Sequence, residues 1–279
     1  MIKYLNLLRI KHYIKNLLIF SPLFFSGSFF SSNDKLVSTG LGFFCFCFLS
    51  SAVYILNDYN DMEKDRKHPT KKFRPLASGA ILPRTALWIM LICLSIVLSI
   101  SFYLKSWQGG FCLILYFALN IAYSLGLKDL PIIDIAILSS GFLIRLFYGD
   151  FISNTEISKW LYLVVLSGSL YMGLGKRRNE FRSHTETRGV LKSYNDSFLD
   201  KNMYVCMTLV IVFYALWTFE SSNANLSWTV PVFILIFMRY SLDVEGDSDG
   251  DPIEVILKDK ELIFGVILYI LVISLLIYL

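Results

Sequence analysis

Residues 36–65 decide the fold, and they read LVSTGLGFFCFCFLSSAVYILNDYNDMEKD. The apolar run over 36–56 is long enough to cross the ~30 Å hydrocarbon core of a bilayer, which takes about 17–25 helical residues. It ends in a polar motif that places Asp58, Asp61 and Asp65 at spacings i, i+3 and i+7. If the helix continues through the motif, the three carboxylates lie on one of its faces at a membrane boundary.

Facing carboxylates repel one another unless a cation lies between them. Mg²⁺ is a hard ion that prefers oxygen ligands and commonly takes substrate phosphates as its remaining ligands. The motif therefore predicts a magnesium site on Asp58, Asp61 and Asp65, with Asn57 beside it as a substrate-binding residue. The alternative is a solvated helix end whose acids are neutralised by the neighbouring basic side chains.

The composition indicates a membrane protein. The chain has 279 residues, of which 55% are hydrophobic and 17% charged, with a mean hydropathy of +0.57. A soluble domain of this size cannot bury so much apolar surface. We therefore predict an all-α polytopic protein with eight or nine transmembrane helices, nine being preferred although Pro22 interrupts the first. The nine predicted spans are 16–31, 36–56, 85–104, 109–127, 131–149, 158–175, 202–220, 226–242 and 261–279.

The basic residues set the expected orientation. Nearly all Lys and Arg fall in segments that share one side with the N-terminus, whereas Lys35, Lys105 and Lys159 fall on the other. The positive-inside rule then predicts an integral inner-membrane protein with its N-terminus and active surface facing the cytoplasm. Residues 1–15 are expected to form an interfacial helix. Arg145 lies near the outer end of its span, and we expect it to extend outward beside Asp150.

Polar residues concentrate in three predicted cytoplasmic loops, of which 57–84 and 176–201 are expected to be catalytic. The outer segments are short and poor in polar groups, which argues against a transporter that needs access from both faces. In the first loop, Arg66, Lys72 and Arg74 are candidates to bind phosphate oxygens that the metal leaves free. The alternative is that such cations follow the positive-inside rule and contact lipid headgroups.

The second loop begins with GKRRNE at 175–180. Lys176 and Arg177 are predicted to receive an anionic substrate, or alternatively to cap the helix dipole. Polar side chains at the same membrane level as the acidic motif could complete a polar substrate site. The alternative for Tyr123 is an ordinary tyrosine of the membrane interface. The further substrate-binding candidates are Tyr123, Lys128 and Tyr194.

A third polar stretch reads DVEGDSDGD at 243–251. It superficially resembles a calcium-binding loop but lacks the twelve-residue ligand pattern with a closing Glu. Two interpretations stay open, a solvated acidic connector and a lid or secondary metal contact.

A protein with several membrane spans and the pattern NDxxDxxxD after its second span resembles the UbiA superfamily of intramembrane prenyltransferases. The motif is complete at 57–65, and the likeness extends across nearly the whole chain. The resemblance implies one domain over 1–279, in which nine helices surround a cavity that opens sideways to lipid. It also implies that Mg²⁺ binds the aspartates.

One departure from the family pattern points to a particular branch. Members that use a prenyl diphosphate carry a second Asp-rich motif at the end of the sixth span, where this chain has the basic sequence at 175–180. This replacement, together with the segments 65–75, 123–128 and 251–259 and the pair Lys15-Asn16, resembles the decaprenyl-phosphate phosphoribosyltransferase branch.

That resemblance implies a Mg²⁺-dependent glycosyltransferase. It would move 5-phosphoribose from phosphoribosyl pyrophosphate to a polyprenyl phosphate and release pyrophosphate, in the synthesis of cell-envelope polysaccharide precursors. Lys176 and Arg177 would bind the ribose 5-phosphate or the lipid phosphate, and Lys11 and Lys15, at the membrane surface, are candidates to bind the lipid headgroup. The sequence does not assign which cation binds which phosphate. The acceptor is already an anion, so no general base is nominated.

Two other functions remain as alternatives at this point. One is a UbiA-type transfer of a prenyl group from its diphosphate to an aromatic acceptor, which requires a second acidic metal site. The other is a non-enzymatic membrane transporter or lipid-binding protein. The bilayer is an expected partner in every case, and nucleic acid is not.

Overall fold

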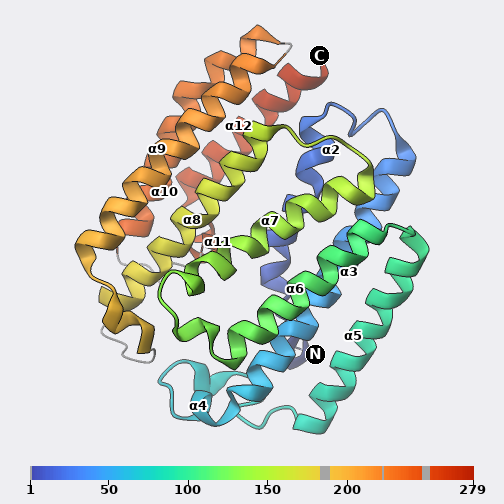
Figure 1. The fold of residues 1–279 in the computed structure, drawn as a ribbon, viewed down its shortest axis with the longest axis vertical. Coiled ribbons are helices and arrows are strands. Elements are labelled where there is room, and N and C mark those ends of the chain that lie inside the picture. The colour runs from blue at the N-terminus through green and yellow to red at the C-terminus, as the bar shows by residue number, and fades with distance from the viewer. Residues whose placement is uncertain (1, 183–188, 222, 247–251) are drawn as a thin grey trace. The chain divides into compact units, whose positions relative to one another are not determined.

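The computed structural model describes residues 2–182, 189–221, 223–246 and 252–279, and these contain helices and loops without any strand. This confirms the all-α prediction (Figure 1). With η for 3₁₀ helices, the elements are α1 (Ile2–Leu8), η1 (Ile10–Phe20), α2 (Ser21–Phe25), α3 (Asn33–Asn60), α4 (Met62–Arg66), η2 (Lys71–Phe73), α5 (Pro83–Leu104), α6 (Trp107–Leu125), η3 (Leu127–Asp129), α7 (Ile133–Ser153), α8 (Lys159–Arg182), η4 (Gly189–Ser193), α9 (Asp196–Glu220), η5 (Ala224–Thr229), α10 (Val230–Glu245), α11 (Pro252–Lys258) and α12 (Lys260–Tyr278).

Seven helical segments in the described ranges are long and apolar enough to cross a membrane. They are α3, α5, α6, α7, α9, the joined η5 and α10, and α12. The chain is therefore an integral membrane protein. Two predicted spans are not among these seven. The first, 16–31, falls on the short helices η1 and α2, and the second, 158–175, falls on α8. A total of nine spans therefore stays a prediction.

The N-terminal segment differs from the expected interfacial helix and first span. Arg9 adopts a left-handed backbone with φ 51°, so α1 ends there and the chain continues as the 3₁₀ helix η1. Pro22 lies in the first turn of α2, where its missing N–H costs no hydrogen bond. Gly27, with φ 73°, follows the end of α2. These breaks replace one long α-helix with three short helices.

Helix α8 is not among the seven candidate spans, and it combines small residues along its length with charged residues at its end. A Cβ added at Gly173 would lie 3.0 Å from Ile135, and one added at Gly175 would lie 2.8 Å from Val244. Small residues of this kind let helices approach closely within a bilayer. The helix also continues to Arg182, so residues 176–182 are helical and not part of a loop. Residues 183–188 of that predicted loop lie outside the described ranges.

The described residues form two compact units, and each is treated by itself. The first comprises 2–127 and 144–156 and the second 128–143 and 157–279. In the first, α3 packs against α1, η1, α5 and α6. Its core includes Phe46, Tyr116 and Tyr148. That the chain is one domain stays a prediction.

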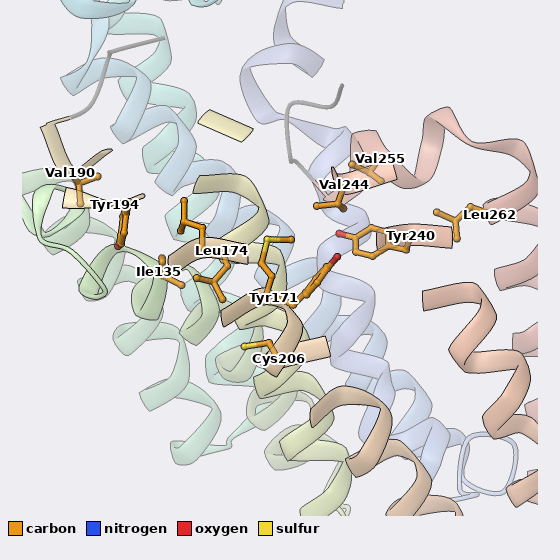
Figure 2. Packing of buried hydrophobic residues seen from close by; sticks show 12 residues of the cluster. Ile135, Tyr171, Leu174, Val190, Tyr194, Cys206, Tyr240, Val244, Val255 and Leu262 are labelled. Carbon is orange, nitrogen blue, oxygen red and sulfur yellow. The ribbon is translucent and has the colours of Figure 1, made fainter. Parts of the chain in front are cut away.

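The second unit packs α8 against α9 and α10. Figure 2 shows its buried cluster, in which Tyr171 and Leu174 of α8 lie among side chains from neighbouring helices, including Tyr240 and Val244 of α10. Tyr171 also donates a hydrogen bond to Ser241 over 2.7 Å. This core fixes the end of α8 that carries the basic residues.

Candidate active site

The acidic motif spans a break between two helices. Helix α3 ends at Asn60, Asp61 has φ −93° and ψ 5°, and α4 begins at Met62. Asn and Asp side chains compete with the backbone for hydrogen bonds and so favour helix ends. The expectation of one unbroken helix through all three aspartates is therefore wrong, although Asp58 and Asp65 still face the same arginine. Asp58 lies in the last turn of α3, and Asp65 lies on α4.

Two of the aspartates are buried and share an arginine. Asp58 and Asp65 are 2% and 4% exposed. Arg74, which follows η2, donates from Nη1 to Asp58 Oδ1 over 3.1 Å and to Asp65 Oδ2 over 2.7 Å. The guanidinium thus bridges the two carboxylates and offsets their repulsion. The structure brings together these three residues of the predicted site.

Arg9 completes this cluster, and the sequence analysis missed it as a site residue. Its Nη2 donates to Asp58 Oδ1 over 2.5 Å, and its guanidinium lies 4.5 Å from the centre of the Tyr54 ring. No local spacing connects residues that are 49 positions apart. In the sequence, Arg9 is one of several basic residues near the N-terminus, and the positive-inside rule alone accounts for it.

Asn57 links the motif to the end of α6. Ser124 donates to Asn57 Oδ1 over 2.5 Å, which places Tyr123, the preceding residue, at the same end of that helix. Gly126, with φ 143°, follows directly and allows the chain to leave the helix.

The other predicted basic residues of the first unit lie on α4, η2 and η1. Arg66 pairs with Glu63 over 2.6 Å and donates to the Ala77 carbonyl over 3.3 Å. Lys72 is exposed, with its ammonium 5.2 Å from the Phe73 ring centre. Lys15 lies partly buried in η1.

A second charged cluster lies at the basic end of α8 in the second unit. Arg177 and Asp134 are both fully buried, and Arg177 donates from Nε to Asp134. It also donates from Nη1 to Glu180 over 2.5 Å. Tyr194 donates to Asp134 Oδ1 over 2.6 Å and accepts the Ile132 N–H over 2.7 Å. Arg177 and Tyr194 therefore meet on one carboxylate.

This second cluster holds a strained turn. Ile132 has φ 69°, an unfavourable backbone region for a β-branched residue, and the Tyr194 hydroxyl fixes its amide. Burial, followed by the hydrogen bond to Asp134, raises the pKa of Tyr194 to about 12. The hydroxyl therefore keeps its proton at neutral pH.

The position of Arg177 conflicts with its predicted contact to a phosphate. A side chain without exposed surface presents no donor to a substrate in this conformation, and its charge is already matched by two carboxylates. The sequence cannot distinguish this arrangement from an exposed cation, because Asp134 comes from another helix. Lys176 is partly buried, and Lys128 lies partly buried in η3.

The carboxylate cluster of the first unit suits Mg²⁺ by its chemistry, since Asp oxygens are the ligands that this ion prefers. Its arrangement differs from a preformed site. Within the described ranges, no three Asp, Glu, His or Cys side chains are grouped so as to hold a metal. The Arg74 guanidinium lies between Asp58 and Asp65 instead, so a bound cation would have to replace these contacts.

Comparisons with known proteins identify the family of this chain. The pattern of the UbiA prenyltransferase family matches residues 18–258. The chain belongs to the UbiA prenyltransferase family. The match runs through both compact units, and it confirms the resemblance seen in the acidic motif.

Three curated UbiA relatives are each named decaprenyl-phosphate phosphoribosyltransferase. The protein from Corynebacterium glutamicum is 35% identical, with 91% of this chain and 80% of the relative covered. The one from Mycolicibacterium smegmatis is 35% identical, covering 91% and 86%. The one from Mycobacterium tuberculosis is 31% identical, covering 91% and 87%.

Solved UbiA structures confirm the fold. A UbiA homolog from Archaeoglobus fulgidus, bound to DMAPP and Mg²⁺, superimposes with a TM-score of 0.75 over 99% of both chains at 18% identity. The same homolog bound to GPP and Mg²⁺ gives 0.72 at 17% identity. At this level of identity, the similarity shows a shared fold and nothing about substrate or role.

Proposed function

We propose that this protein transfers 5-phosphoribose from phosphoribosyl pyrophosphate to a decaprenyl-like polyprenyl phosphate and releases pyrophosphate. The observation that carries the proposal is the 31–35% identity to decaprenyl-phosphate phosphoribosyltransferases over 91% of the chain. The basic end of α8 supports it further, because a second acidic metal site would be expected there in an enzyme that uses prenyl diphosphate. The product would serve the synthesis of cell-envelope polysaccharide precursors.

The proposed catalytic site is the carboxylate cluster of the first unit. Asp58, Asp61 and Asp65 would hold Mg²⁺, which when bound neutralises the charge that develops on the leaving pyrophosphate. Arg9 and Arg74 would be released from the carboxylates as the cation takes their place. Their guanidinium groups would then bind phosphate oxygens, for which their planar donor geometry is suited.

Positioning and charge stabilisation would supply the rate enhancement. The acceptor phosphate is an anion and attacks C1 of the ribose as the bond to pyrophosphate breaks, so no side chain has to remove a proton. Arg177 and Tyr194, which are buried around Asp134, would act by fixing the turn before α7. The proposed direct contacts to substrate are Lys15, Asn57, Arg66, Lys72, Tyr123, Lys128 and Lys176.

The membrane placement belongs to the same proposal. The N-terminus and the site would face the cytoplasm at the inner membrane, where the sugar donor is water-soluble and the lipid acceptor arrives from the bilayer. The N-terminal helices η1 and α2 and the helix α8 would cross as well, giving nine spans.

The test uses the full chain in lipid nanodiscs with phosphoribosyl pyrophosphate and decaprenyl phosphate. We expect Mg²⁺-dependent release of pyrophosphate and a lipid product heavier by one phosphoribosyl group, both lost with EDTA. Activity only with a prenyl diphosphate and an aromatic acid would establish the prenyltransferase alternative instead. Binding of lipid phosphate without turnover would favour a non-enzymatic protein.

A further inference from the structure

Arg145 of α7 is a charged residue buried inside the first unit. Its exposure is 5%, and its neighbours include core residues of the apolar cluster. The expectation that it extends outward is therefore wrong. A charge within a membrane-embedded bundle is costly, and such residues commonly mark function. The contacts of Arg145 show what that function can be.

The guanidinium of Arg145 is held from several directions. Its Nε donates to Asn16 Oδ1 over 2.7 Å, and its Nη2 donates to the Tyr116 hydroxyl over 3.2 Å. It lies 4.8 Å from the Phe46 ring centre and 4.9 Å from that of Tyr116, close enough for cation–π attraction. Burial and directional bonds together fix the position of its partner Asn16.

Asn16 is fully buried and connects α7 to α3. Its Nδ2 donates to Cys47 Sγ over 3.2 Å and to Ser50 Oγ over 3.3 Å. Both polar atoms of its side chain thus form hydrogen bonds within the bundle, to residues from two different helices. Such a satisfied buried network is rigid.

Asn16 belongs to η1, the 3₁₀ helix that begins directly after Arg9. Ser51 of α3 donates to the Leu8 carbonyl over 2.8 Å, just before Arg9. On α7, Gly149 lies so close to the backbone of Ile19 that a Cβ there would overlap it. Contacts on both sides therefore fix the segment from which Arg9 reaches Asp58.

We propose that Arg145 is a positioning residue for the reaction. Through Asn16 it holds η1 in register with α3, and this register places the Arg9 guanidinium on the carboxylate cluster. The inference rests on the proposed function and adds to it a residue in the membrane-embedded part of the chain. A misplacement of about 1 Å in a catalytic group can cost on the order of 100-fold in rate.

A double-mutant cycle tests this inference. We expect Arg9→Ala, Arg145→Met and Asn16→Ala each to lower kcat/KM for pyrophosphate release by about tenfold or more. The double variant Arg9→Ala/Arg145→Met should be no worse than Arg9→Ala alone, because residues that act through one another are not additive. The matched control is Tyr148→Phe, a buried residue of α7 on the same Phe46 ring that makes no hydrogen bond to η1.

Two further measurements separate positioning from a merely structural role. Arg145→Lys keeps the positive charge but lacks the planar donors, so kcat/KM should fall as it does in Arg145→Met. Affinity for Mg²⁺-pyrophosphate, measured by calorimetry, should fall in Arg145→Met in parallel with Arg9→Ala and stay unchanged in Tyr148→Phe.

Additive effects of Arg9→Ala and Arg145→Met would overturn the inference. So would an Arg145→Met variant that melts at a lower temperature than Tyr148→Phe but binds pyrophosphate normally. If the unmodified protein fails to release pyrophosphate from phosphoribosyl pyrophosphate, the proposed function fails instead, and the binding measurements alone then decide the role of Arg145.

Discussion

Two clusters of Asp and Arg differ in how far water reaches them. In the first unit, the side chains of Arg9 and Arg74 are 20% and 30% exposed above nearly buried carboxylates. In the second unit, Arg177 and Asp134 are both sealed from solvent. A partly exposed arginine can exchange a carboxylate for a substrate phosphate, whereas a sealed pair can only hold structure. Similar residue types thus differ in their access to solvent, and this difference is the basis for the two roles proposed here.

The largest effect is expected from Asp61→Asn in the first cluster. Removal of one carboxylate weakens the proposed metal site and leaves pyrophosphate charge uncompensated, so turnover should fall by about 10²–10³-fold or more. The fold should survive, because Asp58 and Asp65 keep their arginines. Pyrophosphate release and thermal unfolding in nanodiscs measure the two outcomes, and undiminished turnover would remove Asp61 from the site.

Arg177→Met should mainly affect stability. The substitution leaves Asp134 buried without its guanidinium, and breaking a buried pair in this way costs about 3–5 kcal/mol. We expect a markedly lower yield of folded protein and a lower unfolding temperature. A stable Arg177→Met variant with weakened binding of inorganic phosphate would show that this cluster is a binding site after all.

Arg74→Met should show the reverse pattern in the partly exposed cluster. Arg74→Met also leaves the buried Asp65 without its arginine, so stability should fall, but by less than in Arg177→Met, because Arg74 is itself partly exposed and Arg9 still neutralises Asp58. Affinity for Mg²⁺-pyrophosphate should fall about tenfold or more, since a charge-assisted contact to phosphate is lost. Equal destabilisation by Arg74→Met and Arg177→Met would abolish the distinction between the clusters.

Lys176→Ala offers a smaller and more selective effect. We expect the apparent KM for one of the two substrates to rise by up to about tenfold, as loss of one cation–phosphate contact implies, with little change in unfolding temperature. Lys192→Ala, an exposed lysine of η4, is the control. Unchanged KM values for both substrates would argue against Lys176 as a contact.

The smallest effect is expected at a third ion pair. Asp259 caps α12 by accepting the N–H groups of Glu261 and Leu262, and it also accepts a hydrogen bond from Arg239. The bond from Arg239 is the main cause that lowers the pKa of Asp259 to about 2. Because the folded pKa lies below the unfolded value of about 3.9, the stabilisation is complete above pH ~4 and is lost as pH falls towards 2. In Asp259→Asn, the unfolding temperature should therefore fall less steeply between about pH 4 and pH 2 than in the unmodified protein.

The features that the sequence predicts correctly are those that depend on a local pattern of residues. Long apolar runs identify the seven membrane-crossing candidates, because a bilayer imposes their length. Asp58, Asp65 and Arg74 lie within one short stretch, so the sequence placed them in one site, but it assigned Arg74 to phosphate oxygens and not to the carboxylates that it contacts. The break at Asp61 was overlooked because the spacing of the acids suited an unbroken helix.

Contacts between residues that are far apart in the sequence could not be predicted from local patterns. Arg9 reaches a carboxylate 49 residues away, and Arg145 bonds to Asn16 across 129 residues. Nothing in their local sequence distinguishes a basic residue that faces lipid headgroups from one that enters a bundle. The burial of Arg177 follows in the same way from Asp134, which lies 43 positions before it.

The 3₁₀ geometry of η1 changes how far a short segment extends. A 3₁₀ helix rises about 2.0 Å per residue, compared with about 1.5 Å in an α-helix. Eleven residues of η1 followed by five of α2 thus give an end-to-end contour of about 30 Å, which equals the hydrocarbon thickness. If η1 and α2 cross the membrane as proposed, the larger rise of the 3₁₀ helix supplies length that the same residues would lack as an α-helix.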